Sequence, residues 1–436
     1  EQASFLVADP KLNHAETVLL SKNLDYGTSI FFNLILKKFF QIFGYDPDIG
    51  RILTILTGVL AIPALSYLAY QIKRNNGYIF VAFLSSISWY LISYSQELRT
   101  YSFLFLFSIL SIIFFFKLLD EKEKIINLNL FLFILISSLA AASHIFFFII
   151  IFSQLIFLII NKYKIRNYFF TKLLAIILIP LIYLFIMFDY LILQLQLGNN
   201  DFWIQQIKLE FFVNFFFSRF FGSKIMGLIY LLTLFYLIII HRKIIFEFSS
   251  KYFFLFLLLF FSYFLPLIYS LFKQPILTDR YIIFVLIPVL ILLSSLLLEI
   301  KIRKIKIFLL AVILLSSVAN NYIEIFQRKV SKPEFKNSIR YIINSKTNNN
   351  IFVLTEHQIH QNIVNNYTKA IMLKENMTFN FLNEIKNNKI DEFWVLCYEP
   401  LNHFQCELKK NNTEEFVIKD QIKFKLINVI LYEKNL

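Results

Sequence analysis

The chain has 436 residues, of which 58% are hydrophobic and 17% charged, with 54 Phe and only 8 Gly. Soluble domains usually have about 25% charged residues, so a water-soluble globular protein is excluded and an integral membrane protein is indicated. The net charge of +14 does not by itself indicate a nucleic-acid partner, and none is expected, because Lys and Arg collect in the cytoplasmic loops of membrane proteins.

Residues 1–49 are predicted to form an outer loop that contains one interfacial helix. The chain begins at Glu1 without a Met or a signal-like segment, so we expect an upstream piece with a first span. In SIFFNLILKKFFQIF, residues 29–43, the polar residues fall on one helical stripe, namely Asn33, Lys37, Lys38 and Gln41. This pattern is typical of a helix that lies on the membrane.

About ten apolar stretches of bilayer length follow. They cover residues 50–72, 78–94, 101–119, 127–143, 145–161, 169–190, 225–240, 252–272, 281–299 and 307–322. The loops that follow every second one of these, beginning with 71–77, carry 16 Lys and Arg in total, against 6 in the alternate loops. The positive-inside rule therefore predicts that the bend at Glu97, residues 1–49 and the C-terminal tail face outward.

The sequence becomes soluble in character near the C-terminus, which predicts a membrane domain over 1–325 and a small extracytoplasmic α/β domain over 326–436. FKNSIRYIINS and FNFLNEIKN are predicted to be helical. NIFVLTE, EFWVLCYE and KFKLINVILYE read as strands. Cys397 and Cys406 could form a disulfide in an oxidising compartment or remain two reduced thiols.

Ionisable residues on the outer side are few and lie at the mouths of spans, where a charge is costly unless it is paired or used. Those that suit acid–base work or the binding of an anionic head group are Glu1, Asp25, Glu97, Arg99 and Arg280, the last followed by Tyr281. A single loop Glu or Arg is more often a solvated residue, and the lone His144 more often a packing residue. No metal-ligand spacing, P-loop, GxGxxG or Ser-His-Asp signature is present.

Several segments in order resemble the polytopic glycosyltransferases of the C class (GT-C), in particular the Rgt-like branch related to protein O-mannosyltransferases and the lipid A aminoarabinose transferase. SYSQELRTYSFLFLFSILS resembles the family's second outer loop, and LDYGTSIFFNLILKKFFQIFGYDPDIGR resembles its first. LTDRYIIFVLIPVLILL resembles the start of a family helix that has the pattern R-Y-x5-P. AASHIFFFIIIFSQ resembles a family helix that often contains a His-Tyr pair. KPEFKNSIRYIINSKTNNNIFVL resembles the start of the family's outer domain. The family's double proline is replaced by Gly27-Thr28-Ser29, Ile145 follows His144, and the Asp of the family's first-loop Asp-Glu pair would precede Glu1.

The resemblance implies an enzyme of the bacterial inner membrane that transfers a hexose or pentose from an undecaprenyl-phosphate donor to a hydroxyl acceptor, with inversion. It implies catalytic carboxylates at Glu1, Asp25 and Glu97. It implies substrate binding by Arg99, Tyr101, His144, Arg280 and Tyr281. Glu97 could orient the acceptor, steer Arg99 or hold a divalent cation, and no other cofactor is expected.

Two other classes remain open from the sequence. An O-antigen polymerase or ligase would also have many spans and outer arginines, but it would have a large outer loop between late spans. A flippase or transporter of lipid-linked sugars would have ionisable residues at mid-bilayer and repeated halves, and neither pattern is evident here.

Overall fold

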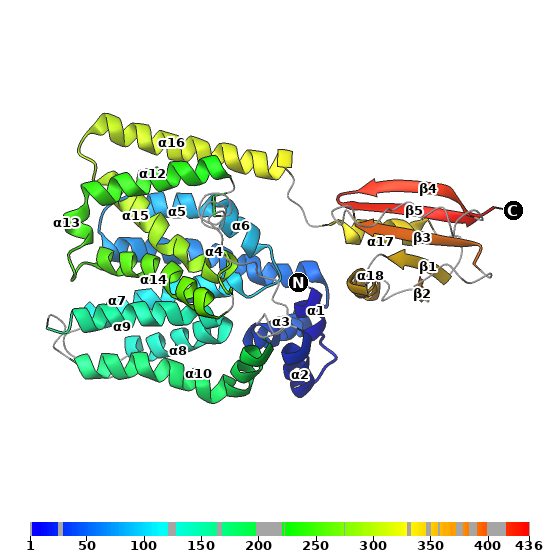
Figure 1. Cartoon of the computed structure of the whole chain (residues 1–436), viewed down its shortest axis with the longest axis horizontal. Helices are drawn as coiled ribbons and strands as arrows, with labels where there is room; N and C mark the ends of the chain where they lie inside the picture. The colour runs from blue at the N-terminus through cyan, green and yellow to red at the C-terminus, as the bar shows by residue number, and fades with distance from the viewer. Residues whose placement is uncertain are drawn as a thin grey trace. The chain divides into compact units, whose positions relative to one another are not determined.

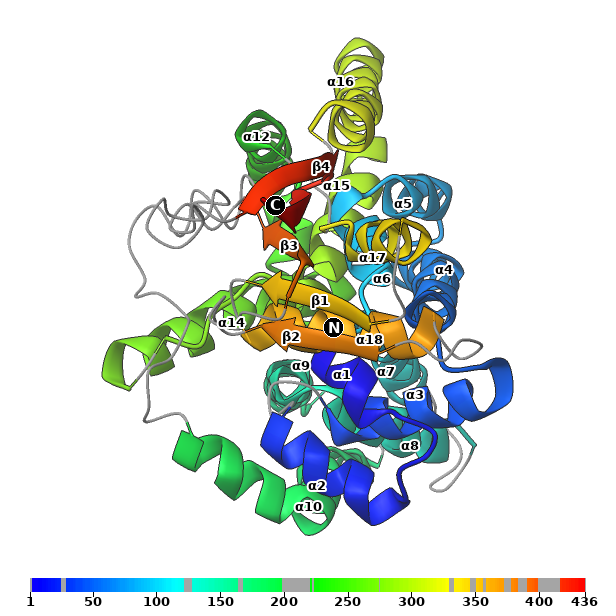
Figure 2. The same ribbon diagram turned by 90° about the vertical axis from the view of Figure 1, so that its right-hand side faces the viewer.

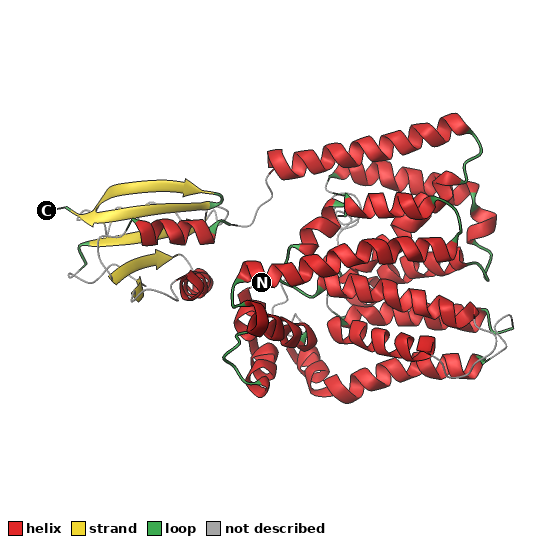
Figure 3. Ribbon diagram, turned by 180° about the vertical axis from the view of Figure 1, so that it is seen from behind, coloured by secondary structure: helices red, strands yellow, loops and turns green. Residues whose placement is uncertain are grey.

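A computed structural model describes residues 2–24, 29–120, 128–163, 168–197, 220–221, 223–273, 275–328, 333–345, 350–355, 358–371, 378–382, 390–398 and 416–435. The chain divides into two compact units, residues 3–328 and 329–436. The described part of the first unit is helical, whereas the second contains a sheet (Figures 1 and 3).

Long apolar helices dominate the first unit. Within the described residues, six are long and apolar enough to cross a membrane: α4 (Pro47–Ile72), α7 (Tyr101–Asp120), α10 (Phe169–Leu197), α14 (Lys251–Phe272), η3 with α15 (Arg280–Val285, Leu286–Leu298) and α16 (Arg303–Tyr322) with the start of η4 (Ile323–Arg328). A seventh candidate is bent by 56° between α5 (Gly77–Ser86) and α6 (Trp89–Ser95). Three shorter apolar helices occupy the other expected positions, α8 (Leu128–Ser143), η1 with α9 (Ile145–Phe147, Phe148–Ile160) and α12 (Lys224–Ile240). The predicted polytopic helical fold is confirmed, and the number of ten spans stays a prediction.

The loops rich in Lys and Arg gather at one end of the helical unit, where the short helix α13 (Arg242–Ile245) also lies (Figure 1). Lys251 pairs with Asp120 at 2.8 Å, and Lys73 pairs with Glu299 at 3.2 Å. Each pair joins two of these loops or their flanking helix ends. The opposite end holds the α6–α7 bend, the junction of α8 with η1 and the start of η3, so the helices alternate in direction as the loop charges predict.

The N-terminal segment folds as three helices, α1 (Gln2–Val7), α2 (His14–Leu24) and α3 (Ile30–Phe43). The polar stripe of α3 is buried in part, since Asn33 is 0% exposed and Lys37 is 1% exposed. The Asn33 amide donates to Ser21 Oγ at 3.2 Å, and Lys37 Nζ donates to Thr17 Oγ1 at 3.0 Å and to the Leu12 carbonyl. The stripe therefore packs against α2, which supplies the polar partners that a surface helix would have taken from water or lipid head groups.

The second unit is a five-stranded sheet with the strand order β2-β1-β3-β5-β4. β1 (Asn350–Thr355) pairs in parallel with β2 (Thr378–Leu382) and β3 (Glu392–Tyr398), and the other pairs are antiparallel (Figure 2). The helices α17 (Phe335–Asn344) and α18 (Gln358–Ile371) pack on one face, because Ile339 and Val364 share an apolar cluster with Val353 and Val429. Cys397 in β3 is disulfide-bonded, and Cys406 lies outside the described residues.

Two secondary-structure predictions in this unit were wrong. FNFL belongs to strand β2, which pairs in parallel with β1, rather than to a helix; the rest of the predicted helix, NEIKN, lies outside the described residues. KFKLINVILYE forms parts of two strands, β4 (Phe416–Phe424) and β5 (Ile427–Lys434). A tight turn separates them at Leu426, which has a φ of 57°, and a continuous apolar pattern does not reveal such a turn.

Replacing Lys37 with Met should loosen α2 from α3. The variant keeps the length of the side chain but removes both hydrogen bonds, leaving the Leu12 carbonyl and Thr17 without this donor at a cost of about 1–3 kcal/mol. Hydrogen exchange should become faster in residues 14–24. Lys38→Met is the matched control, because Lys38 is exposed on the same helix; equal exchange in the two variants would show that Lys37 does not hold α2.

Candidate functional site

The residues singled out from the sequence lie where helices are interrupted at one end of the unit. Glu97 and Arg99 lie in the bend between α6 and α7. His144 is the N-cap of η1, and Arg280 is the first residue of η3. A helix interruption frees the backbone and lets side chains converge at a membrane surface, whereas a continuous span buries its backbone groups in its own hydrogen bonds.

The bend at residues 95–100 is held by Leu98 and Thr100. Leu98 and Thr100 are each 1% exposed, whereas Glu97 and Arg99 are half-buried. Leu98 packs in an apolar cluster with Phe5 and other residues of the N-terminal helices. Thr100 Oγ1 donates to the Ser143 carbonyl at 3.0 Å. The alternation fixes the bend to two neighbouring segments and leaves the carboxylate and the guanidinium at the surface of the site.

His144 directly follows two residues, Ala142 and Ser143, whose carbonyls accept hydrogen bonds from other segments. The Ser29 hydroxyl, at the N-cap of α3, donates to the Ala142 carbonyl. His144 Nδ1 accepts the backbone N–H of Phe146 at 3.2 Å, so a neutral ring would have its proton on Nε2. Burial, together with the positive charge of Arg280, lowers the pKa of His144 to about 3. The imidazole is therefore neutral near pH 7 and offers an Nε2–H donor.

Aromatic rings join Arg280 to the bend and to His144. The ring of Tyr281 lies 4.7 Å from that of His144 and 6.4 Å from that of Tyr101, measured between centroids. Tyr101 also meets Tyr94 edge to face at 5.6 Å. Arg280 directly follows Asp279 and lies near the Tyr281 ring, with its Cζ 6.0 Å from the ring centroid. The three segments therefore form one site.

Asp279 and Tyr94 belong to this site, although the sequence analysis did not select them. Asp279 is 4% exposed, and the Tyr94 hydroxyl donates to its Oδ2 in a long hydrogen bond of 3.5 Å. Tyr94 also interacts electrostatically with Glu97. Both residues lie within the segments that carry the resemblance, and the presence of a carboxylate next to Arg280 at the mouth of a span was the signal that could have revealed Asp279.

The structure brings Glu97, Arg99, Tyr101, His144, Arg280 and Tyr281 together. Tyr101 is only 1% exposed, so it supports its neighbours rather than lining the open part of the site. Glu1 and Asp25 lie outside the described residues, and their predicted roles stay predictions. Among the residues that the structure describes, no group of three or more His, Cys, Asp or Glu side chains could hold a metal ion. A divalent cation at Glu97 therefore also stays a prediction.

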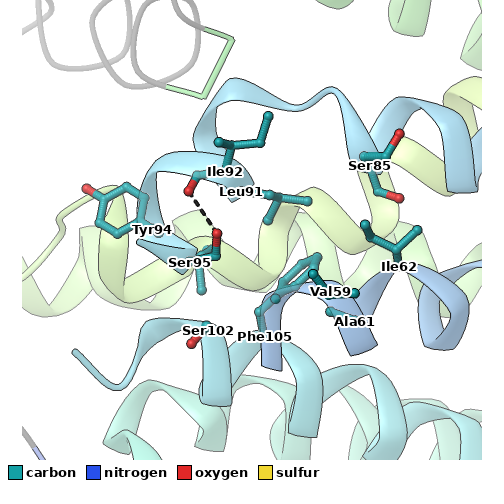
Figure 4. Close-up of a pocket in the computed structure, with 13 residues that line it drawn as sticks. Val59, Ala61, Ile62, Ser85, Leu91, Ile92, Tyr94, Ser95, Ser102 and Phe105 are labelled. Carbon is teal, nitrogen blue, oxygen red and sulfur yellow. Dashed lines mark hydrogen bonds between the residues drawn. The ribbon is translucent and has the colours of Figure 1, made fainter. Parts of the chain in front are cut away.

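A cavity of about 140 Å³ lies beside this cluster, with Tyr94 in its wall (Figure 4). It is formed between α4, α5, α6, α7 and the η3 segment. Gly58 of α4 allows the close approach of α6, because a Cβ at this position would lie 2.6 Å from the Cβ of Ser95. A larger residue at this position would push α6, and with it Tyr94, away from the site.

These features define a polytopic membrane protein with an ionisable site at the helix interruptions on one side and a small α/β unit at the C-terminus. Among solved structures, the fold is shared with ArnT from Cupriavidus metallidurans. The apo ArnT structure matches with a TM-score of 0.60 at 8% identity, over 93% of this chain and 88% of ArnT. The structure of ArnT bound to undecaprenyl phosphate matches with a TM-score of 0.56 at 9% identity over the same shares.

The likeness to ArnT confirms the GT-C fold that the resemblance implied, and at this identity it establishes the fold alone. An oligosaccharyltransferase from Archaeoglobus fulgidus matches with a TM-score of 0.47 at 10% identity, over 78% of this chain and 53% of its own. That likeness is too weak to show a common fold. No protein-family model and no curated protein sequence matches the chain.

Replacing His144 with Gln should reduce the dependence of stability on acid pH. Because the pKa of His144 is lower in the folded protein than in the unfolded chain, the unfolded state binds more protons at pH values between about 3 and 6.5. The free energy of unfolding therefore falls as the pH decreases through this window. Thermal unfolding in detergent between pH 7 and 4 should show a smaller loss in the variant than in the wild type.

The matched control for this measurement is His14→Gln, since His14 is exposed on α2. It should leave the acid-dependent loss of stability as in the wild type. An unchanged pH dependence in His144→Gln would mean that His144 titrates normally, and that it carries a positive charge at mildly acidic pH.

Proposed function

We propose that the chain transfers a hexose or a pentose from a polyprenyl-phosphate donor to a hydroxyl acceptor, with inversion at the anomeric carbon. The observation that carries the proposal is the convergence of Arg280 with the bend at Glu97 and Arg99, at one end of an ArnT-like fold. The ArnT structure bound to undecaprenyl phosphate supports the choice of donor. The acceptor is a glycolipid, a lipopolysaccharide, a surface polymer or a protein.

Arg280 is the proposed ligand of the donor phosphate. A guanidinium can donate two parallel hydrogen bonds to phosphate oxygens, and these charge-assisted bonds are stronger in a partly buried site than in water. Arg280 is half-buried and lies against the Tyr281 ring, with its Cζ 6.0 Å from the ring centroid. Arg99, on the adjacent bend, is the second candidate because both arginines interact electrostatically with Tyr101.

The reaction requires one base and one stabilised leaving group. A carboxylate removes the proton of the acceptor hydroxyl as its oxygen bonds to the anomeric carbon, and the bond from that carbon to the phosphate oxygen breaks. Attack opposite to the leaving group inverts the configuration. Polyprenyl phosphate leaves as an anion that the arginines stabilise, so no proton donor to the leaving oxygen is required. Glu97 is the base candidate among the described residues, beside Glu1 and Asp25 in the first loop.

His144 is proposed to assist as a neutral donor. A neutral imidazole can hydrogen-bond to a phosphate or sugar oxygen through Nε2–H without adding a second positive charge next to Arg280. The lowered pKa fits this role, since a charged His144 would compete with Arg280 for the same anion. Tyr281, which packs against His144, would hold the ring in place.

The proposed location is the bacterial inner membrane, with the site and the C-terminal unit outside the cytoplasm. The support for this orientation is the accumulation of Lys and Arg in loops at the end opposite the site. A donor that is itself a membrane lipid could then reach the site laterally, with its phosphate at the outer surface.

The test is release of free polyprenyl phosphate by the purified protein in detergent. A panel of radiolabelled undecaprenyl-phosphate sugars is supplied with and without a membrane lipid extract as acceptor. Release that depends on the acceptor would establish the transferase and identify its sugar. Absence of release from every donor, in a protein that is folded, would contradict the proposal and favour a polymerase or a flippase.

Arg280→Lys should lower kcat/KM for the donor by about 10- to 100-fold, because lysine retains the charge but loses the paired hydrogen bonds to phosphate. Glu97→Gln should lower kcat by at least about tenfold if this carboxylate acts as the base. Arg74→Lys and Asp120→Asn, at the opposite end of the unit, are the matched controls. Near-normal turnover of both site variants would remove these residues from the mechanism.

A further inference from the structure

The cavity next to the site has walls that are mostly carbon. Its apolar lining includes Val59, Ile62, Leu91, Ile92, Phe105 and Ile283 (Figure 4). Four serines also line it. Ser102 accepts a hydrogen bond from Thr57 Oγ1 at 2.8 Å, and the other three turn their hydroxyls toward their own helices. Ser85 donates to the Ala82 carbonyl at 3.0 Å, Ser86 to the Phe83 carbonyl at 2.7 Å, and Ser95 to the Ile92 carbonyl at 2.8 Å. Because these protons are already used, the cavity favours a hydrocarbon over a polar ligand.

Two residues connect this cavity to the phosphate-binding candidate. Tyr94 lines the cavity, and its hydroxyl donates to Oδ2 of Asp279, the residue that precedes Arg280, at 3.5 Å. Ile283 lines the cavity and follows Arg280 by three residues in the 3₁₀ helix η3. The backbone is kinked between these two residues, at Ile282, which has a φ of −107° and a ψ of 27°. Ile283 therefore ties the cavity to the Arg280 segment along the chain, and Tyr94 ties it through a side-chain contact.

The size and the mouth of the cavity restrict what it can hold. A dry cavity of about 150 Å³ is known to hold one benzene ring, so a volume of about 140 Å³ suits five or six carbons. Val59, in the wall, is 56% exposed on the outer side of α4, so the cavity is not sealed from the bilayer at this point. A long chain could therefore place its first carbons inside and leave past Val59 into the lipid.

We propose that this cavity binds the first isoprene unit of the polyprenyl donor, the five carbons nearest to the phosphate, while the rest of the chain stays in the bilayer. The inference rests on the proposed function and adds a length limit to it: recognition of the lipid ends after one unit. The free energy of a hydrocarbon chain changes little when it moves from lipid into an apolar cavity. The main effect of the contact is therefore to orient the phosphate toward Arg280.

The experiment measures binding of water-soluble phosphates to the full chain in detergent by isothermal titration calorimetry. The probes are methyl phosphate, dimethylallyl phosphate with one isoprene unit, and geranyl phosphate with two. Dimethylallyl phosphate should bind roughly 10- to 100-fold more tightly than methyl phosphate, because its additional carbons leave water. The second isoprene unit of geranyl phosphate should increase the affinity less than the first unit does.

Val59→Trp, which fills the mouth, should abolish most of the gain from methyl to dimethylallyl phosphate. Leu60→Trp is the matched control, since Leu60 is the next residue of α4, is 57% exposed and does not line the cavity; it should retain the gain. A gain that survives in Val59→Trp would overturn the subsite and leave the proposed function standing. Failure of the wild type to bind any prenyl phosphate, undecaprenyl phosphate included, would overturn both.

A cavity-enlarging variant gives an independent answer if Val59→Trp does not fold. Leu91→Ala should admit 2-naphthylmethyl phosphate, whose ring system exceeds the wild-type volume, and should bind it at least tenfold more tightly than the wild type does. Equal binding of this probe by Leu91→Ala and the wild type would show that the hydrocarbon lies elsewhere.

Discussion

An unpaired backbone N–H or carbonyl in the apolar layer of a membrane costs several kcal/mol, and this constraint decides where the chemistry of this protein lies. Continuous helices satisfy their own backbone and leave no place for a site. The functional candidates lie instead where helices are interrupted, and at two of these interruptions side chains from other segments donate hydrogen bonds to backbone carbonyls. Thr100 serves the Ser143 carbonyl, Ser29 serves the Ala142 carbonyl and Asn321 serves the Ile87 carbonyl.

These bonds do more than satisfy the backbone, since each also joins two segments that are far apart in the sequence. Asn321 of α16 holds the break between α5 and α6, and α6 carries Tyr94 into the site. Ser29 fixes the start of α3 to the end of α8, close to His144 in the sequence. The rigidity that the proposed catalysis requires would therefore come from polar contacts between helix ends, and the apolar core beneath them supplies the scaffold.

The proposed function and the lipid subsite divide the donor between two environments. The phosphate is expected at Arg280, among tyrosines and beside a neutral His144, where a guanidinium can act strongly. The first hydrocarbon unit is expected behind Tyr94, where the lining is mostly apolar and three of the four serine hydroxyls are bonded to their own helices. Tyr94 is the wall between the two, so its position, set by the close contact of Gly58 with Ser95, affects both parts of the donor.

The sequence alone determined the helical membrane class, the alternation of the loops and the segments at which the site forms, because bilayer length and loop charge are local properties of the chain. It also singled out Glu97, Arg99, His144 and Arg280, through ionisable groups at the mouths of spans. Only the tertiary structure showed that these residues meet, that α2 covers the polar stripe of α3, and that Asp279 and Tyr94 complete the site. Burial and convergence depend on contacts between distant segments, and the spacing of residues along one segment does not contain that information.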